Sequence, residues 1–299
     1  MAGILSMLKN YIKVIRPKSW LKNIFVFVPL VYSLQLFNVE RLLQTLAAFL
    51  GFCLISSSVY IFNDISDAEK DALHPTKKFR PISSGAISKG SARFVMVLLI
   101  MSGLALIYTI TNTPTVLFAI IYLNMNIAYT IYLKHKPIID CFCIAAGFVL
   151  RIYAGGAAAN ETVSDWLFLT IIAASLFMAF GKRRGEMLLY ENNKNASGTR
   201  EVLEKYDLNY LIGMVFVCAG LSVVFYSLWA LDRGNDMVYT VPLIIFIVLK
   251  YLLLIHDKKS GSKAHGDPTT VIFDDRMFIL ACGLYVALTV YLLYRTGGN

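Results

Sequence analysis

Long apolar stretches alternate with polar connections along the whole chain. Nine of these stretches are long enough to cross the hydrocarbon core of a bilayer as helices. They lie at about residues 20–37, 42–62, 94–111, 114–133, 139–158, 165–181, 209–231, 238–255 and 276–294. This pattern predicts an all-α integral membrane protein with nine transmembrane helices.

The composition leaves too little polar surface for a water-soluble globule. Hydrophobic residues make up 57% of the chain, charged residues make up 16%, and the mean hydropathy is +0.62. These values exclude an ordinary soluble protein. The five cysteines have no paired C-x-x-C spacing, so the sequence supports neither a disulfide framework nor a zinc site.

Lys and Arg residues gather in every second connection. The N-terminal segment and the connections after the second, fourth, sixth and eighth stretches hold most of the 28 Lys and Arg residues. Positive charge is retained in the cytoplasm during insertion, so we expect the N-terminus inside and the C-terminus outside a cell (inner) membrane. The net charge of +9 then reflects topology and anionic ligands, and it gives no reason to invoke nucleic acid. Residues 1–19 resemble an interfacial amphipathic helix.

Four polar residues stand at the end of the second stretch: Asn63, Asp64, Asp67 and Asp71. On a continuous helix their spacing places all four on one face within about two turns. Carboxylates this close together near lipid repel one another, which implies a bound cation or cationic partners. Oxygen ligands of this kind favour Mg²⁺. We therefore expect four metal ligands, of which the three aspartates are catalytic; a solvated helix end without a ligand is the alternative.

The longer connections on the expected cytoplasmic side carry most of the other polar groups. They run at about 63–93, 181–208 and 256–275, and we expect the active site to lie in them. In the first, two prolines force a loop in which Lys77 and Arg80 take phosphate charge, unless the loop only rests on anionic lipid. In the second, Lys182, Arg183 and Glu186 share a helical face, which suits either phosphate capture or an ordinary surface pair.

Two ionisable residues belong to the fifth stretch. Asp140 starts it, and Arg151 lies further along, about 16 Å deeper by the rise of a helix. A guanidinium in lipid needs a partner, so Arg151 faces a polar cavity or pairs across helices. We expect both residues to contact substrate; an Arg that is satisfied purely for packing is the alternative.

The run N-D-x-x-D-x-x-x-D at 63–71, followed by K-x-x-R-P-I at 77–82, resembles the UbiA superfamily of membrane prenyltransferases. The resemblance covers nearly the whole chain and implies a single UbiA-like transmembrane domain, residues 1–299. It also implies a site at which aspartate-rich motifs bind a prenyl diphosphate through Mg²⁺. The second such motif of typical members is replaced here by G-K-R-R-G-E at 181–186.

The departures are similar to one branch of the superfamily, the decaprenyl-phosphate phosphoribosyltransferases. The resemblance rests on R-P-K-S-W-L-K-N at 16–23, H-P at 74–75, G-F-V-L-R at 147–151 and G-K-R at 181–183. It implies transfer of a 5-phosphoribosyl group from phosphoribosyl diphosphate (PRPP) to a polyprenyl phosphate of the decaprenyl type. Diphosphate is released, and the product serves the synthesis of cell-wall arabinan precursors.

Such a donor needs two anion sites, one assisted by metal and one basic. We expect the aspartates and Asn63 to hold Mg²⁺ on the leaving diphosphate, with the loop after them covering the same group. Lys182 and Arg183, together with Lys22, then hold either the donor's 5-phosphate or the acceptor's phosphate, and the sequence leaves this choice open. The acceptor phosphate is already anionic and needs no general base.

Two other functions compete with this interpretation. One is a UbiA-type prenyltransferase that moves a prenyl group to an aromatic acceptor in quinone or haem biosynthesis. The other is a membrane transporter or lipid-scrambling protein in which the acids form a cation pathway, although carboxylates gathered at one membrane surface suit an active site better than a conduit. The sequence does not reveal the oligomeric state or the length of the polyprenyl chain.

Overall fold

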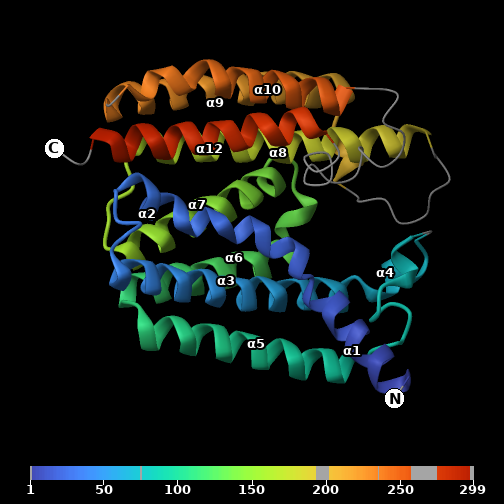
Figure 1. Cartoon of the computed structure of the whole chain (residues 1–299). Helices are drawn as coiled ribbons and strands as arrows, with labels where there is room; N and C mark the ends of the chain where they lie inside the picture. Colours follow the sequence, from blue (N-terminus) through green and yellow to red (C-terminus); the bar gives the residue numbers. More distant parts are fainter. Residues whose placement is uncertain (1, 75, 193–201, 235, 257–274, 297–299) are drawn as a thin grey trace. The chain divides into compact units, whose positions relative to one another are not determined.

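The computed structural model describes residues 2–74, 76–192, 202–234, 236–256 and 275–296. Within these residues every regular element is helical (Figure 1), which confirms the all-α class. The chain divides into two units, each of which is described by itself. Among the described residues, unit 1 comprises 2–143 and 147–162, and unit 2 comprises 144–146, 163–192 and those from 202 onward.

Unit 1 carries the N-terminal helices. They are α1 (Ala2–Ile15), η1 (Pro17–Phe27), α2 (Val28–Tyr32), α3 (Val39–Ser66), α4 (Ala68–Ala72), η2 (Lys77–Phe79), α5 (Lys89–Ile110), α6 (Thr113–Ile131), η3 (Leu133–His135) and most of α7 (Ile139–Ala159). Three of them begin with a side-chain cap. The side chains of Asn38, Ser88 and Asn112 each accept a hydrogen bond from the backbone N–H three residues further on, and this satisfies one of the free donors at the start of α3, α5 and α6.

Unit 2 carries the C-terminal helices. They are α8 (Asp165–Asn192), η4 (Leu203–Lys205), α9 (Leu208–Arg233), η5 (Met237–Thr240), α10 (Val241–His256) and α12 (Arg276–Thr296). The expected loop at 256–275 lies almost entirely outside the described residues, as do residues 193–201 of the expected loop at 181–208.

Eight helical segments among the described residues are long and apolar enough to cross a membrane. They correspond to all of the expected stretches except the first. The segments are Val39–Ser66, Lys89–Ile110, Thr113–Ile131, Ile139–Ala159, Asp165–Leu188, Leu208–Arg233, Met237–His256 and Arg276–Arg295. This pattern indicates a multi-pass membrane protein.

The first expected stretch, at about 20–37, is not one long α-helix. The 3₁₀ helix η1 and the short helix α2 follow each other here, and each has a proline in its first turn. A proline lacks the N–H that an α-helical turn needs and restricts the residue before it, so the chain changes helix type at these points. The nine-helix count thus stays a prediction, with long described helices for eight of the nine stretches.

Helix α3 is the most deeply buried of the long helices in unit 1, and it is packed by α5, α6 and η1 (Figure 1). Phe52, Ile55 and Val59 of α3 are buried with Ile107 of α5 and Tyr122 of α6. A helix enclosed over most of its length has little freedom to shift or rotate. Its C-terminal end, which carries the acidic motif, is therefore held in a fixed position.

Helix α7 approaches η1 at Gly155. A Cβ atom at this position would overlap the backbone carbonyl of Val26. Backbone atoms cannot rotate away as a flexible side chain can, so only glycine allows the two segments to pack at this separation.

We expect Gly155→Ala to destabilise the protein by about 1–3 kcal/mol, because the added methyl group overpacks the contact with Val26. The measurement is the midpoint of thermal unfolding of the purified protein in detergent, followed by circular dichroism. Gly220→Ala is the matched control, since nothing lies within 4 Å of a Cβ at that position of α9. Equal midpoints for the two variants would contradict the packing argument.

Candidate active site at the end of α3

The acidic motif lies where α3 ends and the short helix α4 begins. Asp67 joins the two helices with φ −94° and ψ 1°, so the single helix expected to run through Asp71 is interrupted. The motif side chains therefore do not follow one continuous helical face. Asp64 and Asp71 are only 2% and 4% exposed. Buried carboxylates require cationic or hydrogen-bonding partners, and both have them here.

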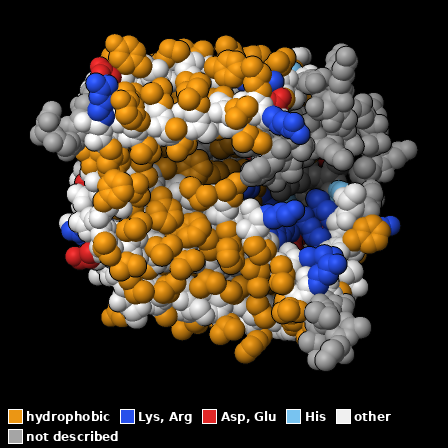
Figure 2. All heavy atoms as spheres, in the orientation of Figure 1, with side chains coloured by type: hydrophobic (Ala, Val, Ile, Leu, Met, Phe, Trp, Pro, Cys, Tyr) orange, Lys and Arg blue, Asp and Glu red, His pale blue; other side chains and the backbone are white. Residues whose placement is uncertain are grey.

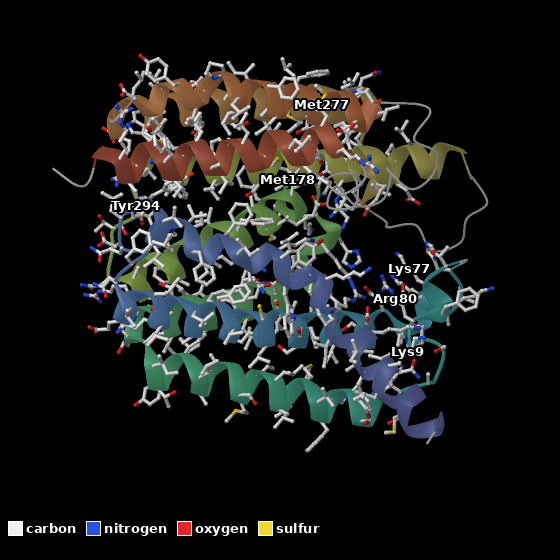
Figure 3. All side chains as sticks on the ribbon, viewed as in Figure 1. Lys9, Lys77, Arg80, Met178, Met277 and Tyr294 are labelled. Atoms are coloured by element: carbon white, nitrogen blue, oxygen red, sulfur yellow. The ribbon has the colours of Figure 1, made fainter. Side chains whose placement is uncertain are left out.

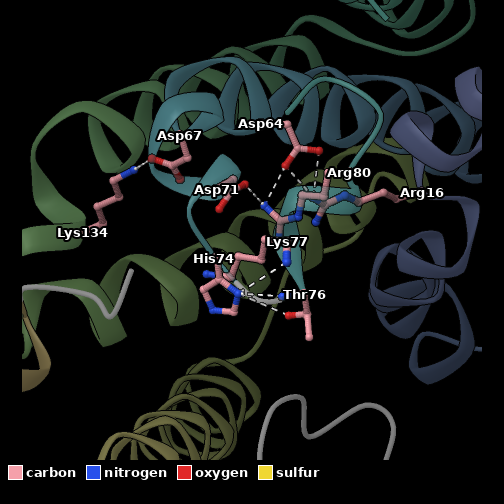
Figure 4. A network of polar contacts seen from close by, with 9 residues as sticks. All are labelled: Arg16, Asp64, Asp67, Asp71, His74, Thr76, Lys77, Arg80 and Lys134. Carbon is pink, nitrogen blue, oxygen red and sulfur yellow. Dashed lines mark hydrogen bonds and ion pairs between the residues drawn. The ribbon is translucent and has the colours of Figure 1, made fainter. Parts of the chain in front are cut away.

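Asp64 is held by an arginine from the start of the chain (Figure 4). Arg16 Nη2 donates to both carboxylate oxygens of Asp64, at 2.6 and 2.9 Å. Arg16 lies between α1 and η1 with φ 55° and ψ 59°, a conformation that costs a non-glycine residue about 1–2 kcal/mol. Its guanidinium also lies over the ring of Tyr60, 5.1 Å from the centroid. These contacts compensate for the backbone strain and fix the orientation of Asp64.

A second arginine joins two of the aspartates. Arg80 Nη1 donates to Asp64 Oδ1 at 3.0 Å and to Asp71 Oδ2 at 2.6 Å. The carboxylates of α3 and α4 thus converge on one positively charged nitrogen (Figure 4). Arg80 directly follows η2, in the loop that we expected to fold over the acids, and the structure brings loop and acids together.

The other two motif residues turn toward the segment around the end of α6. Lys134 Nζ of η3 lies 2.7 Å from Asp67 Oδ1. Thr130 of α6 donates its hydroxyl to Asn63 Oδ1 at 2.6 Å. The structure therefore separates the motif into a pair, Asp64 and Asp71, that shares one cation, and a second group with its own partners.

His74 shapes the loop between the acids and Arg80. Its Nδ1 accepts from the backbone N–H groups of Thr76 and Lys77, at 3.2 and 3.4 Å (Figure 4). Partial burial lowers the pKa of His74, and the positive charges of Lys77 and Arg80 lower that pKa further against the opposing effect of Asp71. A neutral imidazole is the form that can accept these bonds, so the electrostatics favour this loop conformation.

Positive side chains gather at this end of unit 1. Lys9, Lys77 and Arg80 lie at the end where α1 and α4 are found (Figure 3), and Lys and Arg side chains gather there in the space-filling view (Figure 2). Arg80 is 31% exposed at its side chain, whereas Asp64 and Asp71 are nearly inaccessible beneath it. An anionic ligand that approaches this face meets the basic groups first.

The chemistry of the acids suits a divalent metal ion. Mg²⁺ is commonly held by one or two carboxylates, with water and substrate phosphate completing its shell. Asp64 and Asp71 supply two carboxylates that already converge on a cationic nitrogen. Within the described part of the chain, no three Asp, Glu, His or Cys side chains are arranged as a metal site. Asp64 and Asp71 are therefore the two acidic side chains of the motif that could hold a divalent ion together.

Arg151 pairs across helices, which is one of the two arrangements expected for it. Its guanidinium donates to Asn23 Oδ1 of η1 at 2.7 Å, to the Tyr122 hydroxyl of α6 at 2.8 Å and to the Gly147 carbonyl of α7 at 2.7 Å. All three acceptors are neutral, and they fasten three elements of unit 1 together. Arg151 is 5% exposed. These contacts make it a link between helices, and its contact with substrate stays a prediction.

Lys22 and Asp140 lie elsewhere in unit 1. Lys22 is half-buried on η1, next to the fully buried Asn23, and Asp140 is fully buried in the first turn of α7. The roles of both residues in substrate binding stay predictions.

The basic cluster of unit 2 is more enclosed than its sequence suggested. Arg183 of α8 is fully buried and forms an ion pair with Glu186, one helical turn away. Arg184, which the sequence analysis did not single out, is 8% exposed and donates to the carbonyl of Ile255 at 2.9 Å, near the C-terminus of α10. Lys182 is half-buried beside them. The structure thus joins Arg183 to Glu186 as the spacing predicted.

Three partners of the acidic motif escaped the sequence analysis as site residues: Arg16, Thr130 and Lys134. Arg16 was noted only as part of an amphipathic helix and of a family motif, and Lys134 belonged to a basic connection. They lie 48 to 67 positions from the motif residues that they contact. No periodicity within one helix can reveal contacts of this range.

Comparison with known proteins shows which family the chain resembles. The model of the UbiA prenyltransferase family matches residues 24–266. A decaprenyl-phosphate phosphoribosyltransferase of Mycolicibacterium smegmatis is 34% identical over 91% of this chain and 88% of its own length. A protein of the same name from Corynebacterium glutamicum is 33% identical over 94% of this chain and 87% of its own length.

Solved structures share the fold. A UbiA homologue from Archaeoglobus fulgidus bound to GPP and Mg²⁺ has a TM-score of 0.75 and 18% identity, with 95% of this chain and 99% of that chain covered. The expected resemblance is therefore confirmed by the family model, by close relatives and by the fold. The chain belongs to the UbiA prenyltransferase family.

Proposed function

We propose that this protein transfers a 5-phosphoribosyl group from PRPP to a polyprenyl phosphate of the decaprenyl type and releases diphosphate. The observation that carries the proposal is the 34% identity, across nine-tenths of the chain, to a protein named decaprenyl-phosphate phosphoribosyltransferase. The buried acids beneath a basic loop supply the chemistry that a diphosphate leaving group needs.

In the proposed reaction an oxygen of the polyprenyl phosphate attacks C1 of the ribose. The bond between C1 and the diphosphate oxygen breaks, and its electron pair leaves with the diphosphate. The aspartates would hold a divalent ion, which we propose to be Mg²⁺, and when bound it would stabilise the negative charge that develops on the leaving group. The acceptor oxygen is already anionic, so no side chain has to remove a proton from it.

The acidic motif and its loop would handle the leaving diphosphate. Asp64 and Asp71 converge on one point and would hold the ion there, with Asn63 and Asp67 as the further ligands that the motif predicts. Lys77 and Arg80 stand on the loop above them and would donate to the phosphate oxygens. The acids and the loop together would give the site both the metal ligands and the positive charge that a diphosphate requires.

A second anion site would bind the other phosphate. The proposed residues of this site are Lys182 and Arg183 of α8, with Glu186 as internal counter-ion. Lys22, Asp140 and Arg151 of unit 1 are further proposed substrate contacts, each considered by itself. The donor carries a 5-phosphate and the acceptor a phosphate head group, and either one suits a basic site of this kind. The polyprenyl tail would lie against apolar helices.

We further propose a cell (inner) membrane location with the active site facing the cytoplasm, the N-terminus inside and the C-terminus outside. The support is the gathering of Lys and Arg at the end of unit 1 that carries the acids (Figure 2). The ninth crossing would be η1 followed by α2. Eleven residues of 3₁₀ helix at about 2 Å each and five of α-helix at about 1.5 Å span roughly 30 Å, the thickness of a bilayer core.

Direct assay tests the reaction. Purified protein with Mg²⁺, ribose-labelled PRPP and decaprenyl phosphate should form labelled lipid and release one diphosphate per transfer, and removal of divalent ions by EDTA should stop both. Labelled lipid is measured after solvent extraction. Prenylation of an aromatic acid without any phosphoribosyl transfer would instead support the quinone- or haem-type activity, and ion flux without turnover would support a transporter.

Asp71→Asn should lower kcat on the order of 10²-fold or more, because the leaving diphosphate loses a ligand of its stabilising ion. Glu69→Gln is the matched control, since it removes the same charge at a position two residues away. The Glu69 side chain is 91% exposed, and in the described structure it pairs only with Lys89. The measurement is the steady-state transfer rate of each variant, and thermal unfolding checks that both variants are folded. Similar rates would remove Asp71 from the site.

Lys182→Ala should raise the KM for PRPP or for polyprenyl phosphate roughly tenfold, because a charge-assisted contact to phosphate is lost. Lys205→Ala, at an exposed position of η4 in the same unit, should leave both KM values unchanged. Kinetics with each substrate varied in turn identify which phosphate Lys182 binds. Unchanged KM values for both substrates would refute the second anion site at α8.

A further inference from the structure

Cations and acids are equal in number at the end of α3. Asp64, Asp67 and Asp71 carry three negative charges, and the three side chains paired with them, Arg16, Arg80 and Lys134, carry three positive charges. The cluster formed by these six residues is therefore neutral. A free divalent cation that approaches it meets no net attraction from the group as a whole.

The arginines use the same oxygen atoms that a metal ion would need. Asp64 Oδ1 accepts from both Arg16 and Arg80, Asp64 Oδ2 accepts from Arg16, and Asp71 Oδ2 accepts from Arg80. Arg80 Nη1 stands between the two carboxylates (Figure 4). Pairing with Arg80 and sharing of a metal by Asp64 and Asp71 are therefore alternatives.

The arginines lie on the accessible side of the acids. The side chains of Arg80 and Arg16 are 31% and 29% exposed, against 3% and 6% for Asp64 and Asp71. Arg80 follows η2 in a loop with extended backbone, φ −64° and ψ 142°. Its long side chain can turn away from the acids by side-chain rotation alone, and it then points toward a ligand that enters from the accessible side.

We propose that Arg80, assisted by Arg16, is an exchangeable counter-ion that makes metal binding and diphosphate binding depend on each other. Without diphosphate, Arg80 stays on Asp64 and Asp71, because its departure would leave the guanidinium and the buried Asp71 carboxylate without each other and leave Asp64 with Arg16 alone. With diphosphate, Arg80 moves to the phosphate oxygens, and the positions that it held on Asp64 Oδ1 and Asp71 Oδ2 become open to the ion, while Arg16 keeps Asp64 in place. The inference rests on the proposed function, since it assumes that this site receives a diphosphate.

Mutual dependence of two ligands is a measurable coupling. If diphosphate raises the affinity for the metal by some factor, the metal raises the affinity for diphosphate by the same factor. Arg80 links the two here because it neutralises the acids in one state and the phosphate in the other. Its removal should therefore tighten binding of the metal alone and weaken the coupling.

The test is equilibrium dialysis of the full-length protein in phosphatidylcholine nanodiscs, with Mn²⁺ as the metal probe and inorganic diphosphate as the second ligand. Both bound ligands are counted, and dialysis against empty nanodiscs corrects for complexes in solution. We expect the wild-type protein to bind Mn²⁺ weakly alone and at least about tenfold more tightly with diphosphate. In Arg80→Gln we expect Mn²⁺ alone to bind about tenfold more tightly than in the wild type, and the coupling to fall toward one.

Lys89→Gln is the matched control. It removes one positive charge from unit 1, but Lys89 pairs with the exposed Glu69 rather than with the cluster. It should reproduce the wild-type values. Arg80→Lys keeps the positive charge but lacks the forked guanidinium, so it should bind Mn²⁺ alone with intermediate affinity. This variant preserves the test if circular dichroism shows that Arg80→Gln is unfolded.

Equal Mn²⁺ affinities of the wild type and both Arg80 variants, or full coupling in Arg80→Gln, would overturn the exchange. So would tight Mn²⁺ binding to the wild type without diphosphate. Failure of the proposed function gives a different result. A protein that couples the two ligands through Arg80 but transfers no phosphoribosyl group retains the exchange and refutes the donor assignment, whereas transfer without coupling refutes the exchange alone.

Discussion

Two buried carboxylates at the end of a membrane helix are stable only when they have positively charged partners, and the rest of the site follows from this constraint. Asp64 and Asp71 are almost fully enclosed, and one nitrogen of Arg80 lies within 3.0 Å of both. Near lipid such charges are weakly screened, so an unpaired carboxylate here would cost several kcal/mol. The loop after α4 is held over the acids by this contact, and Arg16 adopts a strained backbone to reach the same carboxylate.

The surrounding helices supply the rigidity that this arrangement needs. α3 is buried by α5, α6 and η1, and Arg151 ties η1, α6 and α7 together through neutral acceptors. The close approach at Gly155 fixes η1 against α7. Since Arg16 directly precedes η1, the same packing that stabilises the helices also places a guanidinium on Asp64. Stability of unit 1 and geometry of the acids are thus linked through η1.

Family membership and local geometry bear on different parts of the function. The UbiA family match and the relatives named decaprenyl-phosphate phosphoribosyltransferase cover most of the chain and support the choice of reaction. The contacts at the end of α3 show how the carboxylate charges are neutralised, because they identify which acids share a cation and which basic groups lie above them. In α8, Arg183 is paired internally with Glu186.

The sequence by itself determined the helical class, eight of the expected stretches, the family and the identity of the acids, because hydrophobic length and short motifs are local properties. It also indicated that Arg80 stands over the acids, since prolines on both sides of the basic run require a loop there. The first stretch differed because its prolines changed the type of helix. Only the tertiary structure decided which partner each motif residue has. The break at Asp67 turns that residue toward Lys134, and Asn63 accepts a hydrogen bond from Thr130. Helical spacing describes one helix at a time, whereas these partners come from segments distant in sequence that only packing brings together.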